Sequence, residues 1–244
     1  MKRILVLMML IAPGASFAQS EVGIGFLGGY NYMNGIGWNE VVRHYNLAHP
    51  QFDNNQPLLQ NGFFAGFEFD YEIGNHIFIT PELVYKRVRS VTDNKLYEID
   101  LLMHFITLEV SAEVYVFELG KRVQKGFAHD FYMMAGPGVS YMLPRVYQDL
   151  ELKNGLDGEP YKPSKMVPFF GAGVGYDVYF NKNFGVSPFF RVNAYFPFEI
   201  DDFPEVVLGS NVAEVNDRTS VFNFQLGMSW RYPVSYTHLR AHET

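Results

Sequence analysis

The feature that most constrains this chain is an alternation of apolar and polar residues, in stretches of about ten, that recurs eight times. The stretch at about 104–117 is the clearest example. Its two faces are Ile106, Leu108, Val110, Ala112, Val114 and Val116 on one side and Thr107, Glu109, Ser111 and Glu113 on the other. A period of two is typical of a β-strand whose faces meet different surroundings. The chain is therefore predicted to be all-β.

The same pattern predicts strands at about 22–33, 62–72, 77–88, 104–117, 131–143, 168–180, 184–196 and 220–232. A tilted strand crosses a membrane in about 9–11 residues, whereas strands of soluble proteins usually have about 5–6. Aromatic residues make up 17% of the chain, which suits the aromatic girdles of a membrane barrel. Pro81, Pro137 and Pro188 lie inside the pattern, and because proline removes a ladder donor we expect bulges or near-rim positions there.

The connections between these strands alternate in length. Segments 34–61, 89–103, 144–167 and 197–219 are long and polar, those near 73–76 and 181–183 are tight, and 118–130 is intermediate. Outer-membrane barrels show this asymmetry, with long extracellular loops and short periplasmic turns. The predicted fold is an eight-stranded antiparallel up-and-down transmembrane β-barrel with meander topology.

Both ends of the chain carry segments that we exclude from the barrel. Residues 1–18 have the charged start, short apolar core and small-residue cleavage site of a secretory signal peptide, and cleavage is expected before Gln19. Residues 234–244 break the strand pattern and resemble the translation of a sequencing adapter. We therefore predict a barrel over 19–233, a non-native tail over 234–244, and a natural C-terminus that lacks a few residues here.

Three short motifs resemble one family of barrels. They are Phe78-Ile79-Thr80-Pro81-Glu82-Leu83-Val84-Tyr85, Met134-Ala135-Gly136-Pro137-Gly138-Val139-Ser140-Tyr141 and Gly171-Ala172-Gly173-Val174-Gly175. Each is similar to a strand of the PorT-like outer-membrane β-barrel domains. The resemblance implies a barrel of eight strands in the outer membrane of a Gram-negative bacterium, without an assigned biochemical activity.

The most informative constellation is a set of charged residues on the inward face of the predicted strands. The set is Glu68, Glu82, Lys86, Glu109, Glu113, Asp177, Arg191 and Arg231. An eight-stranded lumen is just wide enough for side chains to fill it, and unpaired charges there are costly. We therefore predict a structural polar network that plugs the lumen, in which excess acids are protonated or bridged by water. A proton or ion path along the same residues is the less favoured alternative.

Other motifs give no catalytic or cofactor site. Gly23-Ile-Gly-Phe-Leu-Gly28 matches a dinucleotide fingerprint, but it lies within a strand and not between a strand and a helix. His129-Asp130 is the most tempting pair for base catalysis, yet it falls at the predicted periplasmic side. The loop at 154–158 is favoured as an ordinary turn over a Ca²⁺ site, and Asp201 and Asp202 as solvated residues over a site for bridging divalent ions. We predict no catalytic residue, metal or cofactor.

The sequence leaves three functions open. The leading one is a structural or binding barrel whose extracellular loops contact lipopolysaccharide, other envelope lipid, a ligand or an envelope or secretion protein. A lipid-modifying enzyme and a narrow channel are the alternatives. The barrel-assembly machinery is an expected partner during insertion, whereas a formal charge of -7 argues against nucleic acid.

Overall fold

The computed structural model describes residues 22–50, 54–74, 76–91, 99–116, 127–148, 151–181, 183–209 and 218–234. The predicted signal peptide at 1–18 and residues 235–244 of the predicted tail lie outside these ranges. Val234 belongs to the last strand, where it pairs with Val22, so the strand runs one residue into the segment that we predicted to be foreign. No helix in the described part of the chain is long and apolar enough to cross a membrane.

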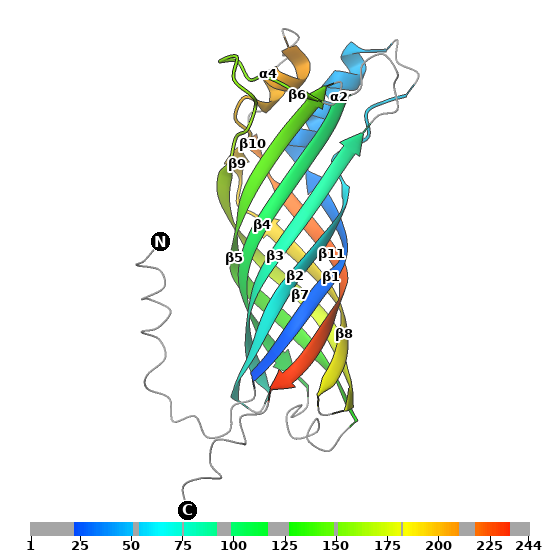
Figure 1. Ribbon diagram of the computed structural model, residues 1–244, viewed down its shortest axis with the longest axis vertical. Helices are drawn as coiled ribbons and strands as arrows, with labels where there is room; N and C mark the ends of the chain where they lie inside the picture. The colour runs from blue at the N-terminus through cyan, green and yellow to red at the C-terminus, as the bar shows by residue number, and fades with distance from the viewer. Residues whose placement is uncertain are drawn as a thin grey trace, which may run out of the picture.

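Eight long strands form a closed antiparallel barrel (Figure 1). They are β1 (Val22–Gly35), β2 (Asn61–Gly74), β3 (Ile77–Val91), β4 (Ile99–Tyr115), β5 (Ala128–Gln148), β7 (Lys165–Asn181), β8 (Phe184–Tyr195) and β11 (Val221–Val234). Each strand pairs with its neighbours in the sequence, and β1 closes the ring on β11. The predicted all-β meander of eight strands is therefore confirmed.

The three prolines are not bulges, so that half of the prediction was wrong. Pro81 and Pro188 each occupy the fifth position of their strands, counted from the turn end, whereas Pro137 lies in the middle of β5. The strand register continues without a shift on both sides of Pro81, Pro137 and Pro188. The shifts lie next to the tight turns, between Glu72 and Gly74 and between Tyr179 and Asn181. The prolines point outward, and a missing ladder donor at a single outward position is tolerated because the flanking pairs hold the register.

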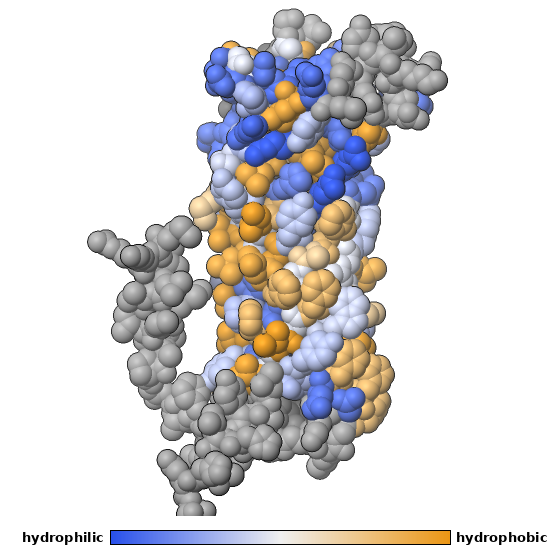
Figure 2. Space-filling model, in the orientation of Figure 1, coloured by the Kyte–Doolittle hydropathy of each residue, from blue (hydrophilic) through white to orange (hydrophobic). Residues whose placement is uncertain are grey.

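The outer wall carries an apolar band (Figure 2). On β4 and the residue that follows it, the band is formed by side chains that are exposed by 41–57%. They include Ile106, Leu108, Val110, Val114 and, just after β4, Val116. Ten residue steps (116 − 106) at about 3.3 Å each, with a tilt of about 40°, give a height of roughly 25 Å. This matches the hydrocarbon-facing band of an outer-membrane barrel.

The long connections gather at one end of the barrel, called here the loop end, and the short ones at the turn end (Figure 1). The loop end holds helices α2 (Ile36–Ala48) and α4 (Phe203–Leu208) and three short strands. These strands are β6 (Glu151–Leu152), which pairs with β5, and β9 (Phe198–Glu199), which pairs with β10 (Arg218–Thr219).

The two helices fold back over the opening instead of projecting as polar loops. Trp38 and Val42 of α2 and Phe203 of α4 are almost fully buried. They pack with apolar side chains of the upper strands, such as Met103 and Val146, to form the mouth core. The prediction of polar loops over 34–61 and 197–219 was therefore wrong for 36–48 and 203–208. A few apolar residues in a helix resemble ordinary loop composition until the partners that bury them are known.

We expect the protein to remain in solution only in detergent or lipid, because the apolar band must be covered. Circular dichroism should show β-structure, and unheated samples should migrate differently from heated ones on a denaturing gel, since a closed barrel resists unfolding until heated. A monomer that stays soluble without detergent would contradict this description.

Candidate functional site

The structure places all eight charged residues predicted to face inward inside the barrel. Their relative exposures lie between 1% and 3%: Glu68, Glu82, Lys86, Glu109, Glu113, Asp177, Arg191 and Arg231. Alternation in the strands brings them there, because residues on the apolar outer face have the opposite parity. Seven of them form two clusters, each centred on an arginine, and Lys86 lies apart.

The Arg231 cluster lies toward the turn end. The guanidinium donates to Glu113 through two nitrogens, at 2.9 Å to Oε1 and 3.0 Å to Oε2. It also donates to Glu68 Oε1 at 2.8 Å and to Asp177 Oδ2 at 3.1 Å, and Asp70 lies 3.8 Å away. One cation therefore holds carboxylates from three strands, β2, β4 and β7, none of which pairs with its own strand, β11.

Two tyrosines complete this cluster. Arg231 donates to the Tyr115 hydroxyl at 2.7 Å and lies over the Tyr132 ring at 5.1 Å. The Tyr115 hydroxyl lies 2.7 Å from Asp177 Oδ2 and 3.0 Å from Glu113 Oε2, so it can donate to either carboxylate. Hydrogen bonds to charged groups in a dry interior are strong, and together they fix the side chains in one arrangement.

The Arg191 cluster lies nearer mid-height. Arg191 binds Glu82 through two nitrogens, at 2.6 and 2.8 Å, and donates to Glu109 at 3.1 Å. Its Nε lies 3.1 Å from the Met134 sulfur, and its guanidinium carbon lies 5.4 Å from the Phe189 ring centroid. The charge is thus covered on its remaining sides by a polarisable sulfur and an aromatic face.

Lys86 differs from the two arginines because it forms no ion pair with a carboxylate in the described part of the chain. Its ammonium lies 3.4 Å from the Tyr195 hydroxyl and 5.3 Å from the Phe169 ring centroid. It therefore marks the boundary between the ionic clusters and the mouth core, in which Phe169 and Tyr195 take part.

The predicted set omitted four buried residues that touch or neighbour these clusters. Asp70 and Tyr115 have the inward parity of their strands, so the alternation itself could have found them. Asp130 was missed because the strand was predicted to begin at 131, whereas β5 begins at Ala128. Tyr132 lies in a run that is apolar on both faces, where alternation gives no direction.

Glycines make room for these carboxylates. A Cβ on Gly25 would lie 2.6 Å from Glu68 Cγ, and a Cβ on Gly23 would lie 3.0 Å from Asp70 Oδ2. These two glycines belong to the G-x-G-x-x-G stretch, which lies inside β1 and is not followed by a helix N-terminus. Gly23 and Gly25 therefore make space for carboxylates in the lumen.

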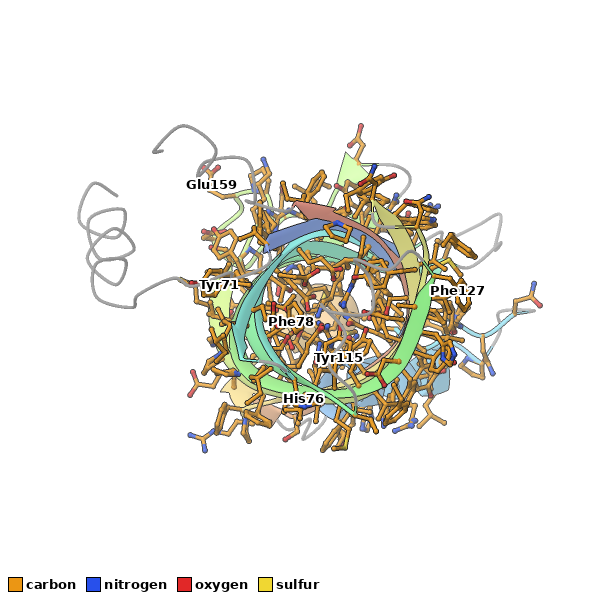
Figure 3. The ribbon with its side chains drawn as sticks, turned by 90° about the horizontal axis from the view of Figure 1, so that it is seen from below. Tyr71, His76, Phe78, Tyr115, Phe127 and Glu159 are labelled. Carbon is orange, nitrogen blue, oxygen red and sulfur yellow. The ribbon has the colours of Figure 1, made fainter. Side chains whose placement is uncertain are left out.

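Aromatic side chains close the turn end beneath the Arg231 cluster. Figure 3, viewed from this end, shows Phe78 and Tyr115 pointing into the ring, whereas Tyr71 and Phe127 lie outside it. The rings of Phe78 and Tyr115 meet edge-on with centroids 5.2 Å apart, and Tyr132 lies 5.0 Å from Tyr115. The clusters are therefore covered from below by apolar surface.

Four amide side chains line another part of the lumen: Asn31, Asn193, Asn223 and Gln225. Asn223 donates to Asn31, but five of the eight amide atoms have no hydrogen-bond partner in the part of the chain described. Buried amides of this kind need water molecules to satisfy them. The polar interior is thus a mixture of ion pairs and groups suited to hydration.

The histidines make contacts outside the lumen. His104 Nδ1 lies 2.6 Å from the Tyr85 hydroxyl and His129 Nδ1 lies 2.7 Å from the Tyr176 hydroxyl, in both cases on the outer wall. His49 Nδ1 contacts the Tyr45 carbonyl at 2.9 Å, within α2. These contacts do not assemble a nucleophile with a base among the described residues.

The loop residues considered for metal binding have ordinary roles. In the 154–158 turn, Gly158 has a positive φ of 81° and Glu159 donates its backbone N–H to Asp157. Asp201 forms an ion pair with Lys165, in which Oδ1 lies 3.2 Å from Nζ. No group of three or more metal-binding side chains occurs within the described ranges.

In the mouth core, burial and the nearby Asp201 and Asp202 raise the pKa of Tyr161, so this phenol is neutral at physiological pH.

A family model described as the outer membrane protein β-barrel domain matches residues 17–199, which is more than half of the chain. The chain belongs to this family of outer-membrane barrels. The match supports an outer-membrane location for the barrel. A search of curated proteins finds no match.

Solved structures of other outer-membrane proteins are also similar to this chain. Ail, the attachment invasion locus protein of Yersinia pestis, has 13% identity and a TM-score of 0.39 over 87% of this chain and 97% of Ail. Neisserial surface protein A has 11% identity and a TM-score of 0.44 over 86% and 96%. OprG from Pseudomonas aeruginosa has 12% identity and a TM-score of 0.35 over 87% and 94%.

Replacement of Arg231 by methionine should destabilise the barrel strongly, because four carboxylates would lose their shared cation while the volume is kept. We expect a loss of about 3–5 kcal/mol in the free energy of unfolding, measured by urea titration in lipid vesicles. The control is Arg89→Met, which removes an exposed ion pair with Asp100 and should cost at most about 1 kcal/mol. Equal losses in the two variants would contradict a central role for Arg231.

Replacement of Gly25 by alanine should also destabilise the barrel, because the added Cβ would collide with the Glu68 side chain. Overpacking of this kind typically costs about 1–3 kcal/mol. Gly74→Ala is the matched control, since a Cβ there meets nothing within 4 Å. The same vesicle titration should therefore separate the two variants, and a neutral Gly25→Ala would mean that Glu68 can move away freely.

Proposed function

We propose that this protein is a closed outer-membrane barrel with a structural or binding role, and that its lumen is plugged. The observation that carries the proposal is the burial of Arg191 and Arg231, each 3% exposed, in contact with carboxylates from several strands. A solvent-filled pore leaves such groups hydrated, whereas the lumen of an eight-stranded barrel is just wide enough for its side chains to fill it.

Apolar layers above and below the ionic clusters support the same proposal. The mouth core, with Trp38 and Phe203 at 2% and 0% exposure, covers the clusters from the loop end. Phe78, Tyr115 and Tyr132 cover them from the turn end. An ion that entered the lumen would have to leave water and cross these layers, which is very costly for a charge.

The surface available for binding is formed at the loop end by α2, α4 and the 154–158 turn, and is called here the cap. We assign it to the extracellular side. Leu47 at the end of α2 and Leu156 in the 154–158 turn are exposed by 75% and 67%. Exposed apolar side chains on a rigid platform suit contact with lipid or a protein partner. The resemblance of 78–85 and 134–141 to PorT-like domains allows a partner in the envelope or secretion machinery. The proposal assigns no catalytic residue.

The full chain, reconstituted in planar bilayers, should show no stepwise conductance at 100 mV of either sign. An open porin prepared in the same detergent serves as the positive control. Steps that appear in the wild-type protein and are lost in Arg191→Ala would contradict the plugged lumen and favour a narrow channel through the Arg191 cluster.

A further inference from the structure

The outer wall carries cationic side chains directly above the apolar band on three adjacent strands. On each of these strands we consider the first outward arginine, lysine or histidine that follows the band toward the loop end. These residues are Arg87 on β3, His104 on β4 and Arg145 on β5. Arg87 is paired in register with His104, and Arg145 is paired with Leu102 one outward position higher. The three residues therefore form one patch, called here the rim patch.

The hydropathy of this wall changes at the level of the rim patch. On β4 the outward residue just below His104 is Ile106, which is 47% exposed, and on β3 the residue below Arg87 is Tyr85. The face seen in Figure 2 includes β3, β4 and β5, and its hydrophilic surface begins above the apolar band. The rim patch thus lies where lipid headgroups replace acyl chains.

The charges of the rim patch are not neutralised by neighbouring acids. Among the described residues, Arg87 forms no side-chain hydrogen bond or ion pair, and its buried Nε has no partner. Within the same part of the chain, Arg145 donates to the carbonyls of Pro144 and Pro163, at 2.6 and 3.1 Å, and to no carboxylate. Asp100, the acid on this part of β4, is already bound by Arg89 at 2.5 Å.

The imidazole between the two guanidinium groups is held in place. The Tyr85 hydroxyl occupies His104 Nδ1 at 2.6 Å, which leaves Nε2 for a further hydrogen bond. Arg87 and Arg145 both lie close enough to act electrostatically on His104. Strands lie about 4.8 Å apart, so two arginines on either side of β4 are roughly 10 Å apart and can approach one anion from both sides.

We propose that the rim patch binds the phosphate group of a phosphorylated glycolipid in the outer leaflet, with its acyl chains along the apolar band below. Guanidinium groups match phosphate oxygens in geometry and charge. The apolar surface below selects an amphiphile over free phosphate. This inference rests on the membrane insertion and orientation in the proposed function, but not on the plugged lumen.

The test measures dissociation constants by native mass spectrometry of the full chain in detergent micelles. The probes are lipid A with both phosphates and lipid A from which the phosphates have been removed, and inorganic phosphate is added as a competitor. The wild-type protein should bind the phosphorylated lipid at least tenfold more tightly than the dephosphorylated one. Millimolar inorganic phosphate should not displace it, because free phosphate makes no contact with the band.

The variant Arg87→Gln/Arg145→Gln should bind phosphorylated lipid A about thirtyfold more weakly than the wild type. The matched control, Arg43→Gln/Lys162→Gln, removes the same charge from exposed positions on the cap and should change the affinity less than twofold. Heat-modifiable migration shows that each variant is folded.

Two results would overturn the proposal that the rim patch recognises the phosphate group, and a third would overturn its assignment to a lipid. One is equal affinity of the wild type for phosphorylated and dephosphorylated lipid, which needs no variant. The other is an equal loss of affinity in the rim-patch variant and the cap control, which would show only a dependence on net charge. Displacement by inorganic phosphate would overturn the lipid assignment. Channel steps in planar bilayers would refute the plugged lumen and leave this result untouched.

Discussion

The closed ladder of backbone hydrogen bonds is the constraint on which the rest of this structure depends. Hydrocarbon offers no partner for a free N–H or C=O group, so a sheet can cross a membrane only when its first and last strands pair. Here β1 and β11 supply that closure along their whole length. Once the ring is closed, each strand residue faces either lipid or the lumen. The alternation of the sequence therefore places apolar side chains toward lipid and polar side chains toward the lumen.

A ring of eight strands leaves little interior space, and this chain fills it with charge. Arg191 on β8 binds carboxylates of β3 and β4, and Arg231 on β11 binds carboxylates of β2, β4 and β7. The ion pairs therefore cross-link strands that are not neighbours in the ring. Glycines such as Gly25 give these side chains the room they need. The clusters are shielded at both ends by apolar side chains, which strengthens the electrostatic attraction and raises the penalty for breaking any pair.

Much of the fold could be predicted from residues because strand parity is a local property. The alternation at 104–117 places Glu109 and Glu113 inward and Ile106 outward without any knowledge of the partners, and the structure agrees. The same reasoning failed at Tyr132, whose neighbours are apolar on both sides. It also failed at Trp38 and Phe203, because a helix that folds over the mouth is recognised only from the strands that bury it.

By itself, the sequence determined the number of strands, their order, their inward and outward faces and the alternation of long and short connections. These properties depend on residues close together in the chain. Only the tertiary structure decided which carboxylate meets which arginine, that α2 and α4 close the mouth, and that Arg87, His104 and Arg145 share one patch on the outer wall. Such contacts depend on the strand register and on ring closure, which bring together residues far apart in the chain: Arg87 and His104 are 17 positions apart, and Glu113 and Arg231 are 118 apart.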